Sequence, residues 1–216
     1  MAGDSGTIFA VSSGAGRAGI AVIRLSGPDT LEAVTRFTGL TDIPPRKATR
    51  VTVKDPESGE LLDDGLVLVF PKPKSFTGED VAELHVHGSR AVLDDIIIAL
   101  SRQPALRPAE AGEFSRRAFD NGKFDLTAAE GLADLINAET TAQRRQAQRQ
   151  LRGDLAALYD DWRDRLMKAI ALFEAEIDFS DEELPPGLRD EVDSAVQLLE
   201  AEIKDHVADP DRGRRV

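Results

Sequence analysis

The chain of 216 residues has no cysteine, one tryptophan, one tyrosine and only three histidines. Without cysteine it can form no disulfide, no thiolate metal site and no covalent cysteine intermediate. Basic residues are also in the minority, with 27 Lys and Arg against 39 Asp and Glu, a net charge of −12. This balance argues against a chain that holds nucleic acid by neutralising phosphates over its surface.

Long apolar runs are missing as well. No stretch approaches the length that spans a bilayer, and Met1 leads into AGDSG instead of a basic and then apolar signal segment. We therefore expect a cytoplasmic globular protein with no membrane partner, large enough to fold without a metal or disulfide.

The residues that are present divide the chain into two parts. Residues 1–126 are rich in glycine, proline and β-branched residues and carry a net charge of −3, whereas residues 127–216 are rich in Ala, Leu, Gln and charged residues and carry −9. We predict an α+β domain over residues 1–122, followed by an all-α domain of long helices over residues 123–216.

In the first part, short apolar or alternating runs predict strands, and a 3.6-residue period predicts helices. A helix is expected after Ser26-Gly27-Pro28, and two prolines exclude Pro71–Gly78 from a central strand. The expected strands are Thr7–Val11, Ile20–Leu25, Arg50–Lys54, Leu61–Phe70 and Val81–His87; the turn is Pro56–Gly59, and a further helix covers Ser89–Arg102.

The second part contains two apolar seams, separated by Pro185-Pro186-Gly187. The first predicts a single long helix, and the second a partner helix, so that the two form a hairpin that other helices complete. The first seam comprises Leu151, Leu155, Leu158, Trp162, Leu166, Ile170, Phe173 and Ile177, and the second Val192, Val196, Leu199 and Ile203.

The loop Gly14–Gly19 matches the dinucleotide pattern G-x-G-x-x-G. That pattern needs a helix to begin at the glycines, whereas Ile20–Leu25 reads as a strand, so a glycine-rich turn is the favoured interpretation. The phosphate-binding sequence G-x-x-x-x-G-K-S/T is absent from the chain. The acidic run Glu174–Glu183 lacks EF-hand spacing and reads as a solvated face.

Glu83, His85 and His87 alternate along one expected strand, so their side chains point to one face. The three could ligate a metal, but no further cluster supplies the remaining ligands, and the favoured prediction is that the chain holds no metal. A carboxylate on an apolar sheet needs a partner. A flat heterocycle with two adjacent N–H donors would satisfy both oxygens of Glu83.

Three segments resemble the MnmE (TrmE) family of tRNA-modification GTPases. They are SGAGRAGIAVIRLSG ending at Gly27, SFTGEDVAELHVHG over Ser75–Gly88, and PAEAGEFSRRAFDNGKFDLTAAEGLADLINAET around Glu113–Asp134. The likeness continues through EAEIDFSDEELP at Glu174–Pro185 and covers essentially the whole chain in order.

The resemblance implies a tetrahydrofolate-binding-like N-terminal domain that also forms a homodimer, then a helical domain interrupted by a GTPase domain. It implies 5-formyl- or 5,10-methylene-tetrahydrofolate as the one-carbon donor. The flavoprotein MnmG (GidA) is the implied partner in a heterotetramer, and the complex carries out 5-carboxymethylaminomethyl modification of the tRNA wobble uridine. Potassium and magnesium ions are implied only for the GTPase domain.

By the same resemblance, the folate contacts fall on Arg24, Glu83 and Lys123, and no catalytic residue lies in this chain. Arginine and lysine would meet carbonyl or carboxylate oxygens of the ligand. The alternative for all three is that they form structural ion pairs.

The chain departs from the family pattern at Ser12-Ser13, where prolines are usual, at His85-Val86-His87, and at its end. Because it ends at Val216, before a phosphate loop, we expect a fragment that cannot hydrolyse GTP. With most of the acidity in the second part, we expect tRNA to be contacted elsewhere or by the partner protein.

Three other functions remain open. They are a stand-alone folate carrier, a folate enzyme resembling aminomethyltransferases with Asp80 as its acid, and a purely structural dimer scaffold.

Overall fold

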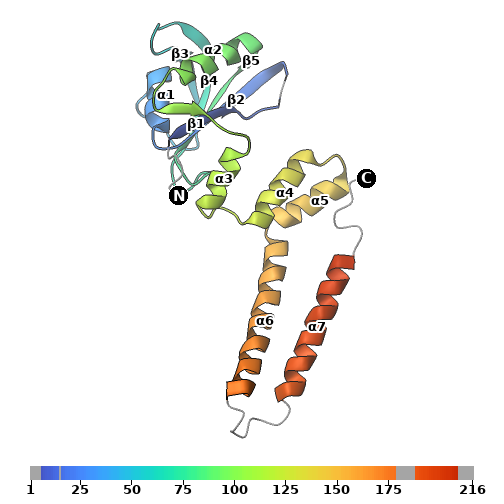
Figure 1. Ribbon diagram of the computed structural model, residues 1–216. Helices are drawn as coiled ribbons and strands as arrows, with labels where there is room; N and C mark the ends of the chain where they lie inside the picture. The colour runs from blue at the N-terminus through green and yellow to red at the C-terminus, as the bar shows by residue number, and fades with distance from the viewer. Residues whose placement is uncertain (1–5, 15, 179–187, 209–216) are drawn as a thin grey trace. The chain divides into compact units, whose positions relative to one another are not determined.

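A computed structural model describes residues 6–14, 16–178 and 188–208 (Figure 1). The chain divides into two compact units, Met1–Phe124 and Asp125–Val216. The division falls two residues beyond the boundary expected from the sequence and assigns Lys123 to the first unit. Pro185–Gly187, and the residues of the acidic run beyond Asp178, lie outside the described residues.

The first unit is built on a six-stranded mixed sheet in the order β3-β4-β5-β2-β1-β6. Neighbouring strands are antiparallel except β1 and β6, which are parallel. The strands are β1 (Thr7–Val11), β2 (Ala18–Ser26), β3 (Thr49–Lys54), β4 (Leu61–Phe70), β5 (Val81–Gly88) and β6 (Leu106–Pro108). The five strands expected from the sequence are therefore confirmed, and the short β6 is additional.

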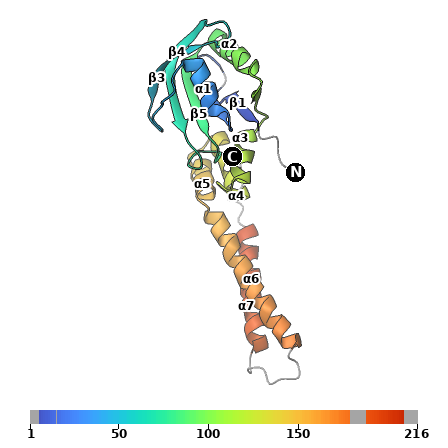
Figure 2. The same cartoon turned by 90° about the vertical axis from the view of Figure 1, so that its left-hand side faces the viewer.

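The helices α1 (Thr30–Thr38) and α2 (Arg90–Ser101) cover one face of this sheet (Figure 2). Phe37 of α1 and Ile96 and Leu100 of α2 pack in one buried cluster with alternate residues of the strands, including Ile23 and Leu84. Because strand side chains alternate between faces, Arg24 and Glu83 lie on the opposite face. The third helix of the unit is α3 (Glu113–Asp120).

The first helix follows Ser26-Gly27-Pro28 as expected, but this segment does not cap it. Ser26 ends β2, and α1 begins only at Thr30, with Asp29 at its N-cap position but without a side-chain cap bond. Gly27 has a φ of 137° and lies so close to Thr7 that a Cβ would come within 2.7 Å of its Cα atom. Only glycine fits this turn.

The loop with the G-x-G-x-x-G pattern connects β1 to β2 in an antiparallel pair. No helix begins at its described residues, so the interpretation as a glycine-rich turn is confirmed. The expected turn at Pro56–Gly59 joins β3 to β4, and Pro71–Gly78 is a loop as expected.

The second unit is helical, so the predicted fold class, α+β followed by all-α, is confirmed. Its helices are α4 (Leu126–Asn137), α5 (Thr141–Leu151), α6 (Asp154–Asp178) and α7 (Leu188–Ala208). The long helix expected for the first seam is confirmed from Leu155 to Ile177 as α6, but Leu151 lies in α5. Leu151 ends α5, and Gly153, which has a φ of 87°, separates it from α6, which begins at Asp154. Residues with a side chain disfavour this backbone conformation.

The two long helices α6 and α7 lie side by side (Figures 1 and 2), as the paired seams predicted. Arg165 of α6 donates to Glu202 of α7 at 2.7 and 3.0 Å. Much of the first seam is still open to solvent, since Leu166, Ile170 and Phe173 are 45%, 43% and 48% exposed. None of the described helices is both long enough and apolar enough to cross a membrane, and the predicted cytoplasmic location stays a prediction.

Helices α4 and α5 approach each other at Gly131. A Cβ on this glycine would lie 2.8 Å from Cβ of Gln150 and 2.9 Å from the backbone nitrogen of Leu151. Backbone atoms cannot move aside as a flexible side chain can, so the contact requires glycine.

We predict that Gly131→Ala destabilises the helical unit by about 1–3 kcal/mol, although alanine is the better helix former. Urea unfolding followed by circular dichroism measures this. Gly19→Ala in β2 is the matched control, because a Cβ there meets nothing within 4 Å. Equal stability of Gly131→Ala and the parent chain would contradict the close packing.

Candidate functional site

An arginine–glutamate pair occupies the centre of the sheet face opposite α1 and α2. Arg24 of β2 and Glu83 of β5 are direct neighbours in the strand register. Arg24 donates through Nε at 3.0 Å and Nη2 at 2.7 Å, and both bonds end on the same oxygen, Oε1 of Glu83. The side chains are 24% and 17% exposed, so the pair is accessible from one side.

Two aromatic rings contact the guanidinium of this pair. The Arg24 Cζ atom lies 5.2 Å from the ring centre of Phe76 and 5.7 Å from that of Phe114, distances typical of cation–π contacts. Phe76 comes from the loop before β5 and Phe114 from α3. The rings hold the guanidinium in place and give the site flat apolar surfaces.

Lys123, the third predicted site residue, is joined to the pair only through the loop over residues 71–80. Its Nζ donates to the carbonyl of Pro73 at 2.9 Å, and the ring of Phe124 lies 6.0 Å from that of Phe76. Gly78, with a φ of 82°, lets this loop approach Lys123 closely. The ammonium group keeps two further donors. The structure thus brings Arg24 and Glu83 into direct contact. Lys123 contacts the same loop that carries Phe76.

A network of buried charged side chains holds this loop and α3 in place. Glu113 of α3, with a side chain only 1% exposed, accepts from Arg107 at 2.7 and 2.9 Å and from Arg117 at 3.1 Å. Arg117 also donates to both carboxylate oxygens of Glu79, each at 3.1 Å, and Glu79 accepts from Ser26 at 2.7 Å. The network therefore ties α3 and the 71–80 loop to the end of β2, two residues from Arg24.

The hydrogen bonds from Arg107, with those from the Glu110 backbone and Arg117, outweigh burial and lower the pKa of Glu113 from 4.5 to about 2. The carboxylate is therefore charged in the folded chain at neutral pH.

The other candidates from the sequence have local partners. His85 Nε2 lies 3.4 Å from Oε2 of Glu83, and His87 Nδ1 lies 2.8 Å from Oδ1 of Asp63. Asp80 accepts from the backbone nitrogen of Lys72 at 2.9 Å, so its carboxylate stabilises the loop. Across the described ranges, no group of three potential ligand side chains could hold a metal ion.

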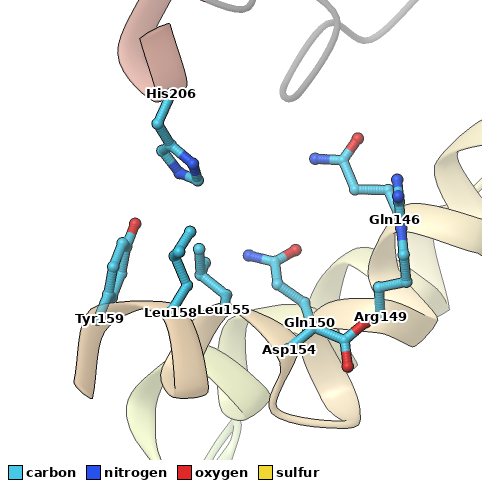
Figure 3. Close-up of a pocket in the computed structure, with 8 residues that line it drawn as sticks. All are labelled: Gln146, Arg149, Gln150, Asp154, Leu155, Leu158, Tyr159 and His206. Atoms are coloured by element: carbon cyan, nitrogen blue, oxygen red, sulfur yellow. The ribbon is translucent and has the colours of Figure 1, made fainter. Parts of the chain in front are cut away.

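A separate cavity of about 390 Å³ lies within the helical unit (Figure 3). Tyr159, Leu158 and Leu155 of α6 face His206 of α7 across it, and Gln146, Arg149 and Gln150 of α5 line another side with Asp154. The sequence analysis did not identify this cavity.

Two family models match the chain on either side of the division between its units. The model described as "GTP-binding protein TrmE N-terminus" matches residues 7–123, and "MnmE helical domain" matches residues 126–216. The sheet unit with its arginine–glutamate pair thus corresponds to the first model, and the helical unit to the second. The chain belongs to the MnmE (TrmE) family, and the resemblance found in the sequence is confirmed.

Relatives support this assignment over the full chain. It is 54% identical over 210 residues to "tRNA modification GTPase MnmE" of Parvibaculum lavamentivorans, covering 97% of this chain and 48% of that protein. It is 53% identical over 216 residues to the human "5-taurinomethyluridine-[tRNA] synthase subunit GTPB3, mitochondrial", covering 99% of this chain and 44% of that protein. The chain thus spans about half the length of the curated relatives it matches.

The sequence reasoning missed Phe76, Phe114 and the network around Glu113. A signal was present, because both phenylalanines and Glu113 lie in the segments that carried the family resemblance. Their role is visible only once strand register and loop position bring them to Arg24.

We predict that Glu113→Gln lowers the free energy of unfolding at neutral pH by about 3–5 kcal/mol, because it leaves the buried Arg117 and the partly exposed Arg107 without this carboxylate. The folded pKa is depressed, so the charged form's contribution is complete above about pH 4.5 and is lost as the pH falls toward about 2. The difference in free energy of unfolding between Glu113→Gln and the parent chain should therefore become smaller as the pH falls over this range. Urea unfolding measures it. Glu57→Gln, at an exposed ion pair with Arg102, is the control and should show little gap. A Glu113→Gln gap that does not change with pH would contradict this assignment.

Proposed function

We propose that this chain is the folate-binding and dimerising part of a GTPase that modifies tRNA. In this proposal Arg24, Glu83 and Lys123 bind a 5-formyl- or 5,10-methylene-tetrahydrofolate. The family assignment and the names of the relatives support the tRNA-modification context. The single observation that carries the folate proposal is the partly exposed arginine–glutamate pair, whose guanidinium contacts two aromatic rings.

The geometry of Glu83 supports a heterocycle with N–H donors. Arg24 uses only Oε1, and the contact of Oε2 with His85 is long at 3.4 Å. A planar ring edge can donate to Oε2 without breaking the ion pair, so binding leaves no charge unpaired. Phe76 and Phe114 offer faces against which a pterin ring can pack. Lys123 is suited to carbonyl or carboxylate oxygens of the same ligand.

In the whole protein, the folate supplies a one-carbon unit for carbon 5 of the wobble uridine, and the flavoprotein MnmG (GidA) supplies electrons. GTP hydrolysis, with magnesium and potassium ions, belongs in this proposal to a domain outside these 216 residues. The residues of this chain bind and orient the folate and pair two copies of the protein.

Titration calorimetry with 5-formyltetrahydrofolate tests the site. Each charge-assisted hydrogen bond contributes about 1.5–3 kcal/mol, so Glu83→Gln should weaken binding by about 10- to 150-fold. Glu57→Gln is the matched control, because it removes a glutamate from an arginine pair outside the site, at 3.2 Å from Arg102. Undiminished binding by Glu83→Gln would exclude Glu83 from the site. No heat with the parent chain would instead favour the ion-pair scaffold.

Homodimerisation through the first unit is a further part of the proposal. Ile20 of β2 and Leu66 of β4 are 67% and 41% exposed. Apolar side chains so exposed on a sheet face are suited to burial against a second copy.

We predict that the chain sediments as a dimer and that Leu66→Lys converts it to a monomer, because the ammonium group would be buried in the interface. Ile170→Lys is the matched control in the helical unit, since Ile170 is 43% exposed. A monomeric parent chain, or a dimer that only Ile170→Lys dissociates, would show that the interface is not in the first unit.

A further inference from the structure

Helix α5 is rich in positive charge although the chain as a whole is acidic. Between Glu139 and Asp154 there are four arginines and no acidic residue, within a chain of net charge −12. The four are Arg144, Arg145, Arg149 and Arg152, the last of which caps the C-terminal end of the helix.

Arg145, Arg149 and Arg152 share one exposed side of α5, and the exposed Arg144 lies at its edge. Ala147 is 1% exposed and marks the opposite side, where α5 packs closely against Gly131 of α4. Residues two apart on a helix face away from each other, so Arg145 and Arg149 point away from this contact. With 1.5 Å rise per residue, the arginines extend over about 12 Å along the axis. We call this side the arginine face.

No carboxylate of the described residues pairs with the arginine face. Within the described part of the chain, none of its four guanidinium groups lies within ion-pair distance of an Asp or Glu, and Arg144 donates only to Gln148, at 3.0 Å. The neighbouring helix is different, because Arg163 pairs with Asp160 at 2.9 Å and Arg165 with Glu202 at 2.7 Å. The charges of α5 are therefore available to a partner.

Helix stability does not account for this placement. Cations near the C-terminal end of a helix gain from its dipole, which suits Arg149 and Arg152 but not Arg144 and Arg145 near the N-terminal end. Arg145 and Arg149 are also four residues apart, a spacing at which like charges destabilise a helix. The start of α5 is secured instead by a capping box between Thr140 and Gln143. Helix stability therefore does not explain the two arginines near the start of α5.

We propose that the arginine face binds the phosphate backbone of tRNA. Arginine presents a planar fork of donors that matches a phosphate group, and several of them along a rigid helix match a row of phosphates. The choice of tRNA rests on the proposed function, supported by the names of the relatives. The surface lies in the more acidic part of the chain, where the sequence analysis expected no tRNA contact.

The test measures binding of a fluorescently labelled, unmodified tRNA transcript to the 216-residue chain and to R144Q/R145Q/R149Q, at about 50 and about 200 mM salt. Each phosphate contact contributes about 0.7–0.9 to the salt slope, so three contacts should make the parent chain lose about 20- to 40-fold more affinity over this range than the variant does. R144K/R145K/R149K keeps the charge and should keep most of the salt slope.

The matched control is R50Q/R90Q/R163Q, which removes the same charge from exposed arginines elsewhere. It should bind tRNA within about twofold of the parent chain. An equal loss of tRNA affinity in the two triple variants would show that net charge alone explains the effect, and it would overturn the proposal. No binding by the parent chain at low salt, or displacement of tRNA by polyglutamate at the same charge concentration, would overturn it as well. The latter result would indicate an acidic protein partner.

Titration of the same samples with 5-formyltetrahydrofolate separates the two proposals. Folate binding without arginine-dependent tRNA binding would overturn the arginine face alone. Arginine-dependent tRNA binding without folate binding would overturn the folate site and leave the arginine face supported. Circular dichroism of each variant must show unchanged helix content, and a variant that loses helix is replaced by the single substitution R145Q.

Discussion

The first unit depends on the carboxylate of Glu113, which is almost completely buried and held by two arginines. A buried charge is costly unless its partners are well placed, so this group fixes the positions of whatever carries those partners. Arg107 belongs to β6. Arg117 extends the network to Glu79, which in turn accepts a hydrogen bond from Ser26. One electrostatic requirement thereby sets the position of α3 and of the loop before β5. Those two elements carry the aromatic rings that contact Arg24.

Much of the fold could be predicted, because alternation and apolar spacing are local properties. The strand containing Glu83 and the hairpin around Pro56–Gly59 follow from such patterns. The break between α5 and α6 could not be predicted in this way, because Leu151 continues the apolar spacing across it. Gly153 ends the helix by its left-handed backbone conformation. The spacing of apolar residues does not report backbone conformation. The partner of Glu83 was also missed, because the pairing with Arg24 depends on register between distant strands.

The net charge of a segment also says little about the local charge at any one site. A sum over 90 residues averages charges that lie much farther apart than the Debye length, about 8 Å at physiological ionic strength. The helical part is acidic as a whole, yet a phosphate group near α5 is exposed first to the arginines closest to it. Acidic surfaces elsewhere would repel the same phosphate and restrict the orientations in which a polyanion can approach. Total charge and local field are therefore separate properties of this chain.

The arrangement of Arg24 and Glu83 has a consequence for ligand discrimination. The two charges cancel within the pair, so an empty site presents almost no net field to a molecule approaching from solvent. Attraction at a distance is weak, and affinity has to come from hydrogen-bond direction and ring packing at contact. Such a site tolerates changes in ionic strength but not the loss of a donor from the ring edge. It therefore discriminates between ligands by the pattern of their donors and not by their charge.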